Sequence, residues 1–468
     1  MLHIFHPNTY IPERKYIFDV LLREFLGLEY ELHPSERTDV CITDSTDLTT
    51  PAIKTLILAD QLFATPEIDW LAVESLPHQP FPIWNTTESA LTFQLVEPRL
   101  PIIYGTLATR QVPLSVSETN ITLSLDIFGS AFFCLTRYEE IVSPLMDTHG
   151  RFLLKASLAW QENFLHRPLV NEYLEILWAL LSRLWPMLER KAYHHQVILS
   201  CDVDWPYCAA TYNTLKVLRA SALDITSRRE PRLAWQRLRS HITAQKETDP
   251  CNTFEWIAGL SEHYGFPHAF YFIPSHSGGA IDGIYTLDDP WIRQLLRFVS
   301  SRHYEIGLHT SYQTFTDAHQ TRLEKDKLID VMNQEHITQE VRGGRQHYLR
   351  WKNPLTWQNW EDSTLKYDST LTFAEHVGFR CGTCYEYPVF NLKSRRQLAL
   401  HERPLIVMEA SLLTYMKVSF SEAIAKVDEL NRVCRQFNGN FTLLWHNSNL
   451  ISQLQRTTYE EALRTLGS

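Results

Sequence analysis

The stretch Ser200-Cys201-Asp202-Val203-Asp204-Trp205-Pro206 places two carboxylates at the end of an apolar run, Val197-Ile198-Leu199. A short apolar run bounded by turn-forming residues is typical of a buried strand. Aspartate rarely stays buried without a partner, so Asp202 and Asp204 need a metal ion, another cation or water. The choice among these partners decides whether the chain is a metal-dependent enzyme.

Strand-like and helix-like segments alternate from Gln196 onward. This rhythm predicts repeated βα units and a parallel sheet or barrel. The expected strands are Val197–Cys201, Ala269–Ile273, Glu305–Leu308, a segment near Glu340–Arg342, Leu365–Tyr367, Leu405–Met408 and Phe441–Trp445. The expected helices are Phe254–Tyr264, Pro290–Arg302, Arg322–Glu335 and Ser421–Phe437.

Ionisable side chains follow most of these strands. In a β/α barrel the loops after the strands gather at one face, which carries the chemistry. One such residue means little, since a lone histidine or aspartate there is more often a hydrogen-bonded structural residue or a turn cap. The whole set is harder to explain as scattered surface polarity: Asp202, Asp204, His309, Arg345, Asp368, Glu409 and His446.

The part before the barrel lacks such a constellation. Residues 1–120 mix helical and strand patterns and predict a small α/β domain of unknown role. Residues 121–190 are rich in Leu, Phe and Trp and predict a packed helical connecting region. Residues 191–468 form the predicted barrel domain, so the fold class is α/β.

Composition narrows the function classes. The net charge of −10 argues against a nucleic-acid binder. The start of the chain has no secretory pattern, and no apolar run approaches the roughly 20 residues that span a bilayer. Eight cysteines scattered over 468 residues fit reduced thiols. These observations predict a cytoplasmic protein without a membrane span.

The motif order resembles the polysaccharide deacetylase (NodB-homology) family, in its Asp-x-Asp subgroup. The matching residues are Asp202-Val-Asp204, His309-Thr310-Ser311, Arg345-Gln-His347, Asp368 and Leu444-Trp445-His446. Residues 1–190 also resemble an uncharacterised N-terminal region that precedes such deacetylases in some bacteria. Phe128-Gly-Ser-Ala-Phe132-Phe133 and Leu135-Thr-Arg137-Tyr138-Glu139-Glu140 carry that match.

The resemblance implies a distorted (β/α) barrel of NodB type and a metal-dependent carbohydrate deacetylase. It implies that Asp202 is the general base, Asp204 and His309 are metal ligands, and His446 is the general acid. Arg345 would pair with Asp202, and Asp368 would orient Arg345. The implied metal is Zn²⁺, which polarises the acetyl carbonyl and activates water.

One position departs from the family pattern. A second histidine is expected four residues after His309, where spacing on a helical turn would aim both side chains at one metal. This position is Gln313, a poor zinc ligand. His347 is the candidate replacement, in a loop whose Gly343-Gly344 allows unusual backbone turns.

The substrate side is less specific. Trp205, Tyr348 and Trp445 flank the motifs and are candidates either for stacking on sugar faces or for wall packing. Arg380 is a candidate for substrate binding or for an ordinary buried ion pair. The implied substrate is a carbohydrate of bacterial surface-polysaccharide metabolism that carries an acetyl group, and an N-acetyl group is favoured over an O-acetyl group. The N-terminal domain is a candidate for binding a protein partner.

Two other functions remain open. A nucleotide-sugar glycosyltransferase would use Asp202 and Asp204 to hold a divalent ion against a diphosphate. That function would leave His309, His347 and His446 without a role. A non-catalytic carbohydrate-binding protein on a decayed deacetylase scaffold would explain Gln313.

Overall fold

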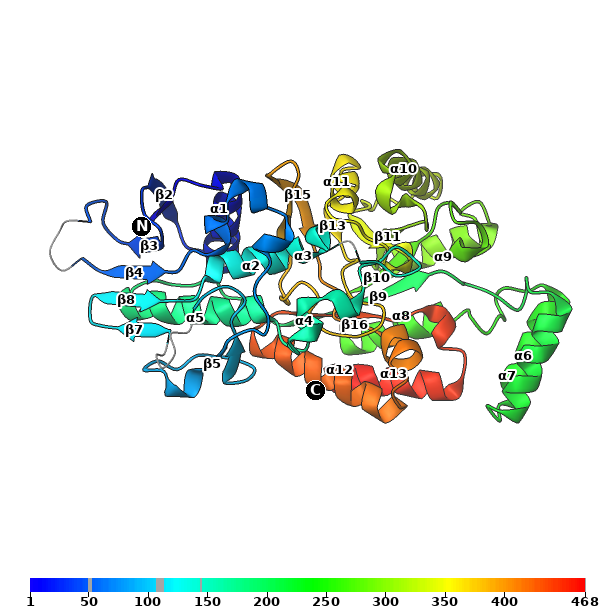
Figure 1. Cartoon of the computed structure of the whole chain (residues 1–468). Coiled ribbons are helices and arrows are strands. Elements are labelled where there is room, and N and C mark those ends of the chain that lie inside the picture. The colour runs from blue at the N-terminus through cyan, green and yellow to red at the C-terminus, as the bar shows by residue number, and fades with distance from the viewer. Residues whose placement is uncertain (49–52, 107–112, 144, 468) are drawn as a thin grey trace. The chain divides into compact units, whose positions relative to one another are not determined.

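A computed structural model describes residues 1–48, 53–106, 113–143 and 145–467 of this mixed α/β protein. It has two compact units, shown as a cartoon in Figure 1. The first comprises Met1–Thr148, Phe152–His194 and Phe379–His401. The second comprises His149–Arg151, His195–Gly378 and Glu402–Ser468.

The segment Phe379–His401 differs from the sequence-based expectation, which assigned it to the barrel. It belongs to the first unit because its polar groups find partners there. Arg380 forms an ion pair with Glu140 at 2.7 Å, and the Tyr387 hydroxyl donates to the Leu135 carbonyl at 3.0 Å.

The first unit contains a mixed sheet with the strand order β2-β1-β3-β4-β8-β7. Its strands are β1 (Leu2–Pro7), β2 (Tyr30–Ser35), β3 (Val40–Thr43), β4 (Thr55–Leu58), β7 (Leu114–Val116) and β8 (Asn120–Leu123). The unit also holds the pair β5 (Ile83–Asn85) and β6 (Arg99–Pro101), together with β14 (Tyr387–Asn391) and most of β15 (Arg396–Glu402).

Helices bury the apolar side chains of this unit. They are α1 (Ile11–Phe18), α2 (Ile127–Leu135), α3 (Tyr138–Val142), α4 (Leu158–Gln161) and α5 (Leu169–Leu184). Every residue of α2 is buried, and Asp126 caps its first turn by accepting from the Gly129 backbone N–H at 2.7 Å.

The second unit contains a curled half-barrel sheet of parallel strands in the order β13-β12-β11-β10-β9-β17-β16. The strands are β9 (Gln196–Val203), β10 (His268–Phe272), β11 (Glu305–Thr310), β12 (Gly343–Gln346), β13 (Tyr367–Asp368), β16 (Val407–Met408) and β17 (Asn440–Leu444). Because the strands are parallel, their carboxyl ends share one edge of the sheet.

Helices follow these strands, as the alternation predicted. They are α6 (Thr214–Thr226), α7 (Pro231–Thr243), α8 (Phe254–Tyr264), α9 (Pro290–Ser301), α10 (Ala318–Gln334), α11 (Leu355–Asp362), α12 (Phe420–Gln436) and α13 (Gln453–Leu466). The expected helix Phe254–Tyr264 is confirmed at both ends, whereas α6 and α7 were not expected.

Strand β12 begins three residues later than expected, because Gly343 and Gly344 are part of the strand and not of a loop after it. A Cβ on Gly344 would lie 1.8 Å from the Leu308 carbonyl oxygen, and one on Gly343 would lie 2.3 Å from that of Tyr367. The two glycines therefore serve close strand approach, not an unusual turn.

The expectation that all cysteines are reduced thiols is wrong for one pair. Cys208 and Cys251 form a disulfide, although they are 43 residues apart in the sequence. Helices α6 and α7 lie between them, and the chain after α7 comes back beside the chain before α6. The other six cysteines are buried and lie outside this disulfide. Within the described ranges, no helix combines the length and apolar character needed to cross a lipid bilayer.

Candidate functional site

Three ligand-type side chains converge at the carboxyl edge of the half-barrel. Asp204 follows β9, His309 lies on β11, and His347 follows β12. Asp204 Oδ1 lies 3.2 Å from His309 Nε2, and Asp204 Oδ2 lies 3.7 Å from His347 Nε2. Their donor atoms all fall within 4.8 Å of one another. The strand-end arrangement predicted from the sequence thus brings all three candidate metal ligands together.

Both imidazoles are fixed by a hydrogen bond on the far nitrogen. His309 Nδ1 lies 2.8 Å from the Arg345 carbonyl oxygen, and His347 Nδ1 lies 2.7 Å from Asp282 Oδ1. These contacts leave each Nε2 directed at Asp204. Partners of this kind orient histidine ligands in metal sites.

The surroundings of Asp204 favour a bound cation. Asp204 Oδ1 is buried and accepts no hydrogen bond from the described residues. Burial raises the pKa of Asp204, but the neighbouring His347 and His309 outweigh this effect and hold it well below its usual range. One carboxylate oxygen and two imidazole nitrogens are donors that divalent transition metals accept, zinc among them.

Asp202 lies beside this group and is held by Arg345. Arg345 Nη1 donates to Asp202 Oδ1 at 2.6 Å, which leaves Oδ2 at 3.7 Å from His309 Nε2. Burial lowers the pKa of Arg345, yet the Asp202 charge raises it overall. The predicted pairing of Arg345 with Asp202 is therefore present.

His446 also lies close to Asp204. Its Nδ1 lies 2.6 Å from Glu409 Oε1, and its Nε2 lies 3.6 Å from Asp204 Oδ2. Burial lowers the pKa of His446, but Glu409 outweighs burial and raises it to about 10. Glu409 also accepts from Asn449 Nδ2 at 2.8 Å, so the imidazole is held firmly.

These groups open into a cavity of about 410 Å³. Trp205 and Tyr348, two of the candidate substrate-binding residues, line it, and Arg151 and Tyr415 line it as well. Tyr348 has a left-handed backbone, with φ of 60°. Bulky residues adopt this conformation rarely, and such strain concentrates at functional sites.

Two predicted substrate contacts lie elsewhere. Trp445 is buried and packs its ring against Tyr459 at 5.0 Å, so its side chain forms part of the core. Arg380 lies in the first unit, where Arg380 and Arg137 both bind Glu140. The ion-pair interpretation of Arg380 and the packing interpretation of Trp445 fit these positions.

Asp368 does not bind Arg345 directly. Its Oδ1 accepts from the Thr370 backbone N–H and hydroxyl, while Arg345 Nε donates to the Ser369 carbonyl at 2.8 Å. Burial raises the pKa of Asp368 to about 7. The expected positioning of Arg345 thus comes from the backbone and hydroxyl of Ser369.

Gln313 is exposed and lies outside the ligand group. Its backbone N–H donates to the Ser277 hydroxyl at 2.9 Å, and its side-chain Oε1 accepts from Arg350 at 3.3 Å. The residues after His309 form only a short 3-10 turn, Thr314–Thr316, so the helical spacing expected for a second histidine is absent.

Asp282 and Glu409 orient His347 and His446, but sequence reasoning assigned neither of them a specific role. Glu409 follows β16, and that strand-end position was its only signal. Asp282 ends a short 3-10 turn, Gly279–Asp282, in a long loop, and nothing in its local sequence indicates a contact with a residue 65 positions away.

Comparisons with known proteins give family and fold similarities. A family of unknown function, DUF7033, matches residues 2–186. No curated protein matches the chain. Solved structures that are similar include a Mycobacterium smegmatis protein assigned as a polysaccharide deacetylase, with 14% identity over 59% of this chain and 85% of that one and a TM-score of 0.38.

Two other solved structures are similar. One is a mutant of BA3943, a CE4 family pseudoenzyme with restored enzymatic activity, with 9% identity over 58% of this chain and 62% of that one and a TM-score of 0.30. The other is Puue allantoinase, with 11% identity over 58% of this chain and 83% of that one and a TM-score of 0.33. The chemistry of the site is inferred from its own geometry.

Proposed function

We propose that the second unit is a metal-dependent hydrolase that removes an acetyl group from a carbohydrate. The convergence of Asp204, His309 and His347 beside Asp202 and His446 carries this proposal. A ligand group, a base and an acid within one cavity are the parts that acyl-group hydrolysis needs.

Asp204, His309 and His347 would hold the divalent ion, and zinc suits this donor set. When bound, such an ion polarises an acyl carbonyl and lowers the pKa of water. The side chains around it are fixed in advance, because Asp282 and the Arg345 carbonyl already orient the two imidazoles.

Asp202 accepts the proton of the attacking water through Oδ2. Its other oxygen is occupied by Arg345 at 2.6 Å, so only Oδ2 is available on the side of the ligand group. As the water oxygen bonds to the acetyl carbon, its proton passes to this carboxylate. Arg345 acts as a positioning residue that keeps the carboxylate oriented.

His446 donates a proton to the leaving group from Nε2. Glu409 occupies Nδ1 and turns Nε2 toward the cavity. An amine leaves poorly unless it is protonated as the C–N bond breaks, so a fixed acid at this position favours N-acetyl over O-acetyl substrates. Acetate and the free amino sugar are the products.

Trp205, Tyr348 and Tyr415 give the cavity aromatic walls. Aromatic rings bind the apolar faces of sugars, and Arg151 adds a positive side chain at the same rim. These residues make a carbohydrate the favoured acyl donor. A glycosyltransferase is less well supported, because it would leave His309, His347 and His446 without a role.

The test measures metal content and acetate release on the same variants. Asp204→Asn and His309→Ala should lose stoichiometric metal in elemental analysis and release no acetate from N-acetylated oligosaccharides. His446→Ala should keep the metal and lose turnover. His319→Ala, which removes an exposed histidine on α10, is the matched control and should keep both.

Two results would overturn the proposal. A folded wild-type protein that takes up no stoichiometric metal cannot use this mechanism. A protein that binds metal and sugar but releases no acetate from N- or O-acetylated sugars would instead be a carbohydrate-binding protein on the same scaffold.

A further inference from the structure

The helices α6 and α7 form a hairpin that stands out from the rest of the second unit (Figure 1). The two helices pack along one another through Val217, Leu233 and Ala234, which are buried. Asp224 joins them, because its carboxylate accepts from Arg237 Nε at 2.8 Å. The hairpin is therefore a folded element with its own small interface.

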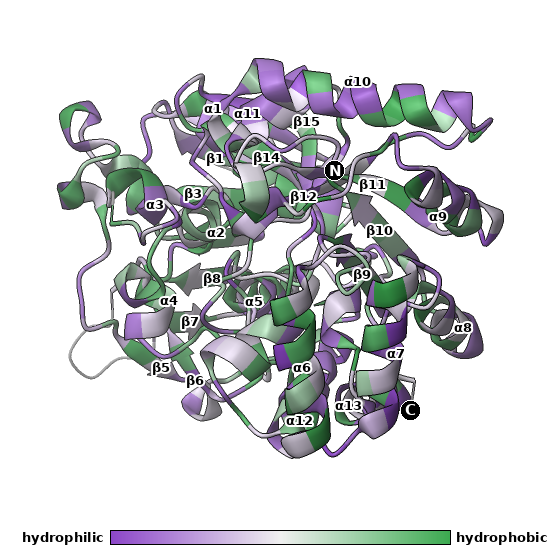
Figure 2. Cartoon of the chain, turned by 90° about the vertical axis from the view of Figure 1, so that its right-hand side faces the viewer, coloured by the Kyte–Doolittle hydropathy of each residue, from purple (hydrophilic) through white to green (hydrophobic). Residues whose placement is uncertain are grey.

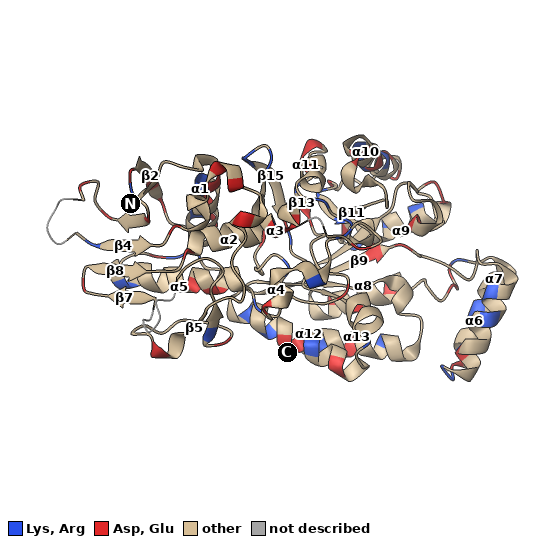
Figure 3. Ribbon diagram, in the orientation of Figure 1, with Lys and Arg blue, Asp and Glu red and all other residues tan. Residues whose placement is uncertain are grey.

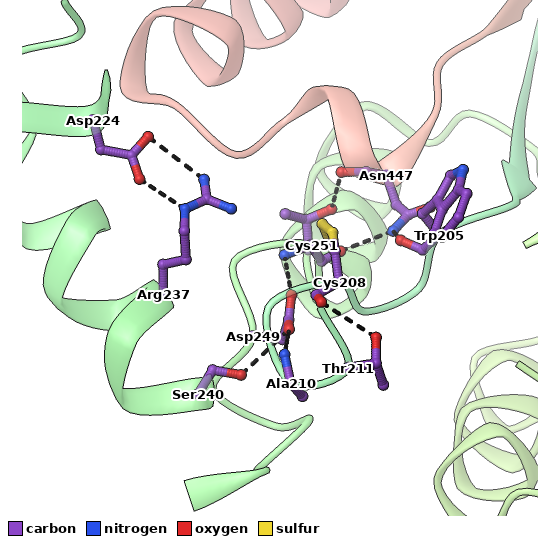
Figure 4. The surroundings of a disulfide bond; sticks show 11 residues. Trp205, Cys208, Ala210, Thr211, Asp224, Arg237, Ser240, Asp249, Cys251 and Asn447 are labelled. Carbon is purple, nitrogen blue, oxygen red and sulfur yellow. Dashed lines mark hydrogen bonds and ion pairs between the residues drawn. A yellow bond between two sulfur atoms is a disulfide. The ribbon is translucent and has the colours of Figure 1, made fainter. Parts of the chain in front are cut away.

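The disulfide clamps the base of this hairpin (Figure 4). Cys208 lies before α6 and Cys251 lies after α7. Asp249 adds three further contacts, accepting from the Ala210 N–H at 2.9 Å, the Cys251 N–H at 3.0 Å and the Ser240 hydroxyl at 3.3 Å. The hairpin thus projects from a closed, hydrogen-bonded base.

Both helices expose large apolar side chains. Leu215, Leu218, Ala222 and Ile225 follow i, i+3, i+7, i+10 spacing, which places them in one stripe along α6. On α7, Trp235 and Ile242 are one heptad apart. The exposed fractions are 80% for Leu215, 51% for Leu218, 53% for Ile225, 65% for Trp235 and 77% for Ile242. Figure 2 shows hydrophobic segments in green on both helices.

The same hairpin is strongly basic in an acidic chain. Residues 214–243 carry seven Lys and Arg residues and two acidic ones, whereas the whole chain has a net charge of −10. Figure 3 shows Lys and Arg in blue on α6 and α7. Arg219, Arg232 and Arg239 are exposed beside the apolar stripes. A partner must therefore accept apolar side chains and positive charge together.

We propose that the α6–α7 hairpin docks on an anionic lipid surface. Helices that combine Trp, Leu and Ile with Lys and Arg bind in the plane of the membrane interface, where the apolar side chains insert and the cations meet anionic headgroups. A projecting, convex pair of helices suits a flat and deformable surface. The absence of a spanning helix among the described residues is compatible with this mode of binding.

The hairpin is linked to the cavity of the proposed active site. The Tyr212 ring packs against cavity residue Trp205 at 6.3 Å, and the Lys216 ammonium lies 5.3 Å from the centre of the Tyr212 ring. Docking would present the cavity to acetylated sugars carried at a membrane surface. This consequence for the substrate rests on the proposed function, whereas docking itself does not.

Vesicle flotation with the full-length, disulfide-intact protein tests the proposal. We expect binding to phosphatidylcholine vesicles that contain phosphatidylglycerol, and at least about tenfold weaker binding to phosphatidylcholine alone. Arg239→Gln should weaken binding about fivefold, which corresponds to about 1 kcal/mol for one basic residue near the surface. Leu218→Glu and Trp235→Glu should weaken it at least about tenfold by placing charge in the apolar stripe.

Leu454→Glu on α13 is the matched control, since Leu454 is 54% exposed and Leu218 is 51% exposed. It should bind vesicles like the wild type. Circular dichroism and melting temperature verify that each variant is folded. The flotation assay needs no catalysis, so a failure of the hydrolase proposal would leave its outcome unchanged.

The proposal is overturned if the wild type binds neither vesicle, or binds both equally. It is also overturned if Leu218→Glu and Trp235→Glu bind anionic vesicles as the wild type does. A wild type that ignores vesicles but forms a dimer, which Trp235→Glu dissociates in analytical ultracentrifugation, would assign the apolar face to a second copy of the chain.

Discussion

Asp282→Asn tests whether the orientation of His347 determines metal affinity. Asp282 is fully buried, and its two oxygens accept three hydrogen bonds, from His347 Nδ1 at 2.7 Å, the Tyr312 N–H at 2.7 Å and the Gly278 N–H at 2.6 Å. All three partners donate, but asparagine offers one oxygen and one NH₂ group. Either orientation of the amide therefore sets a donor against a donor.

The expected effect follows from this lost contact. Removing a partner that orients a histidine ligand weakens metal binding about 10- to 100-fold, or about 1.4 to 2.7 kcal/mol. Competition between the protein and a calibrated chelator measures the change directly. Acetate release at saturating metal should then recover most of its rate, because the catalytic side chains remain.

Asp288→Asn is the matched control for this experiment. Asp288 lies on the same long loop, but its side chain is 71% exposed and pairs with Arg293. It should leave metal affinity unchanged. A folded Asp282→Asn protein whose metal affinity stays within about twofold of the wild type would show that His347 is not oriented by Asp282, or is not a ligand.

Three further changes test other parts of the structure. Gln313→His should leave metal affinity unchanged in the chelator assay, because position 313 is exposed beside Arg350; a tighter site would show that the missing histidine matters. Arg380→Ala should lower the free energy of urea unfolding by about 3 kcal/mol by breaking a buried ion pair, with unchanged KM for the sugar in the folded fraction; a raised KM would restore the substrate-binding interpretation. Burial lowers the pKa of His268 to about 3. Between about pH 3 and pH 6.5 this histidine is therefore protonated in the unfolded chain but neutral in the folded protein, so stability falls as the pH falls through this range. The wild type should therefore lose about 2 kcal/mol more than His268→Gln between pH 7 and pH 5 in urea unfolding, and equal losses would contradict this coupling.

The sequence predicted the strand-end residues well because parallel strands convert local position into spatial proximity. Asp204, His309 and His446 are far apart in the chain, yet each follows or ends an apolar run that is easy to locate. Once the strands are parallel, their carboxyl ends meet at one edge. Local patterning and one topological rule were therefore enough to bring together most of the candidate site.

Long-range pairing decides the positions that the sequence left open. Arg380 and Trp445 stand near the expected motifs in sequence, but their positions depend on which buried partner each finds, Glu140 and Tyr459 respectively. No local pattern encodes those partners. The hairpin α6–α7 was missed for a related reason, because its outward apolar stripes obscure the usual contrast between a buried and a solvated helix face.

The third candidate ligand, His347, shows how neighbouring strands can replace a helical spacing. The family pattern expects two histidines one helical turn apart, but the chain after His309 does not form an α-helix. Strands β11 and β12 are hydrogen-bonded neighbours, with His309 paired in register with Arg345, and His347 lies two residues further on. Left-handed φ values of 60° at Tyr348 and 56° at Leu349 turn the backbone directly after His347. Strand adjacency thus brings a second imidazole to Asp204 without the helical turn, and Gln313 lies outside this group.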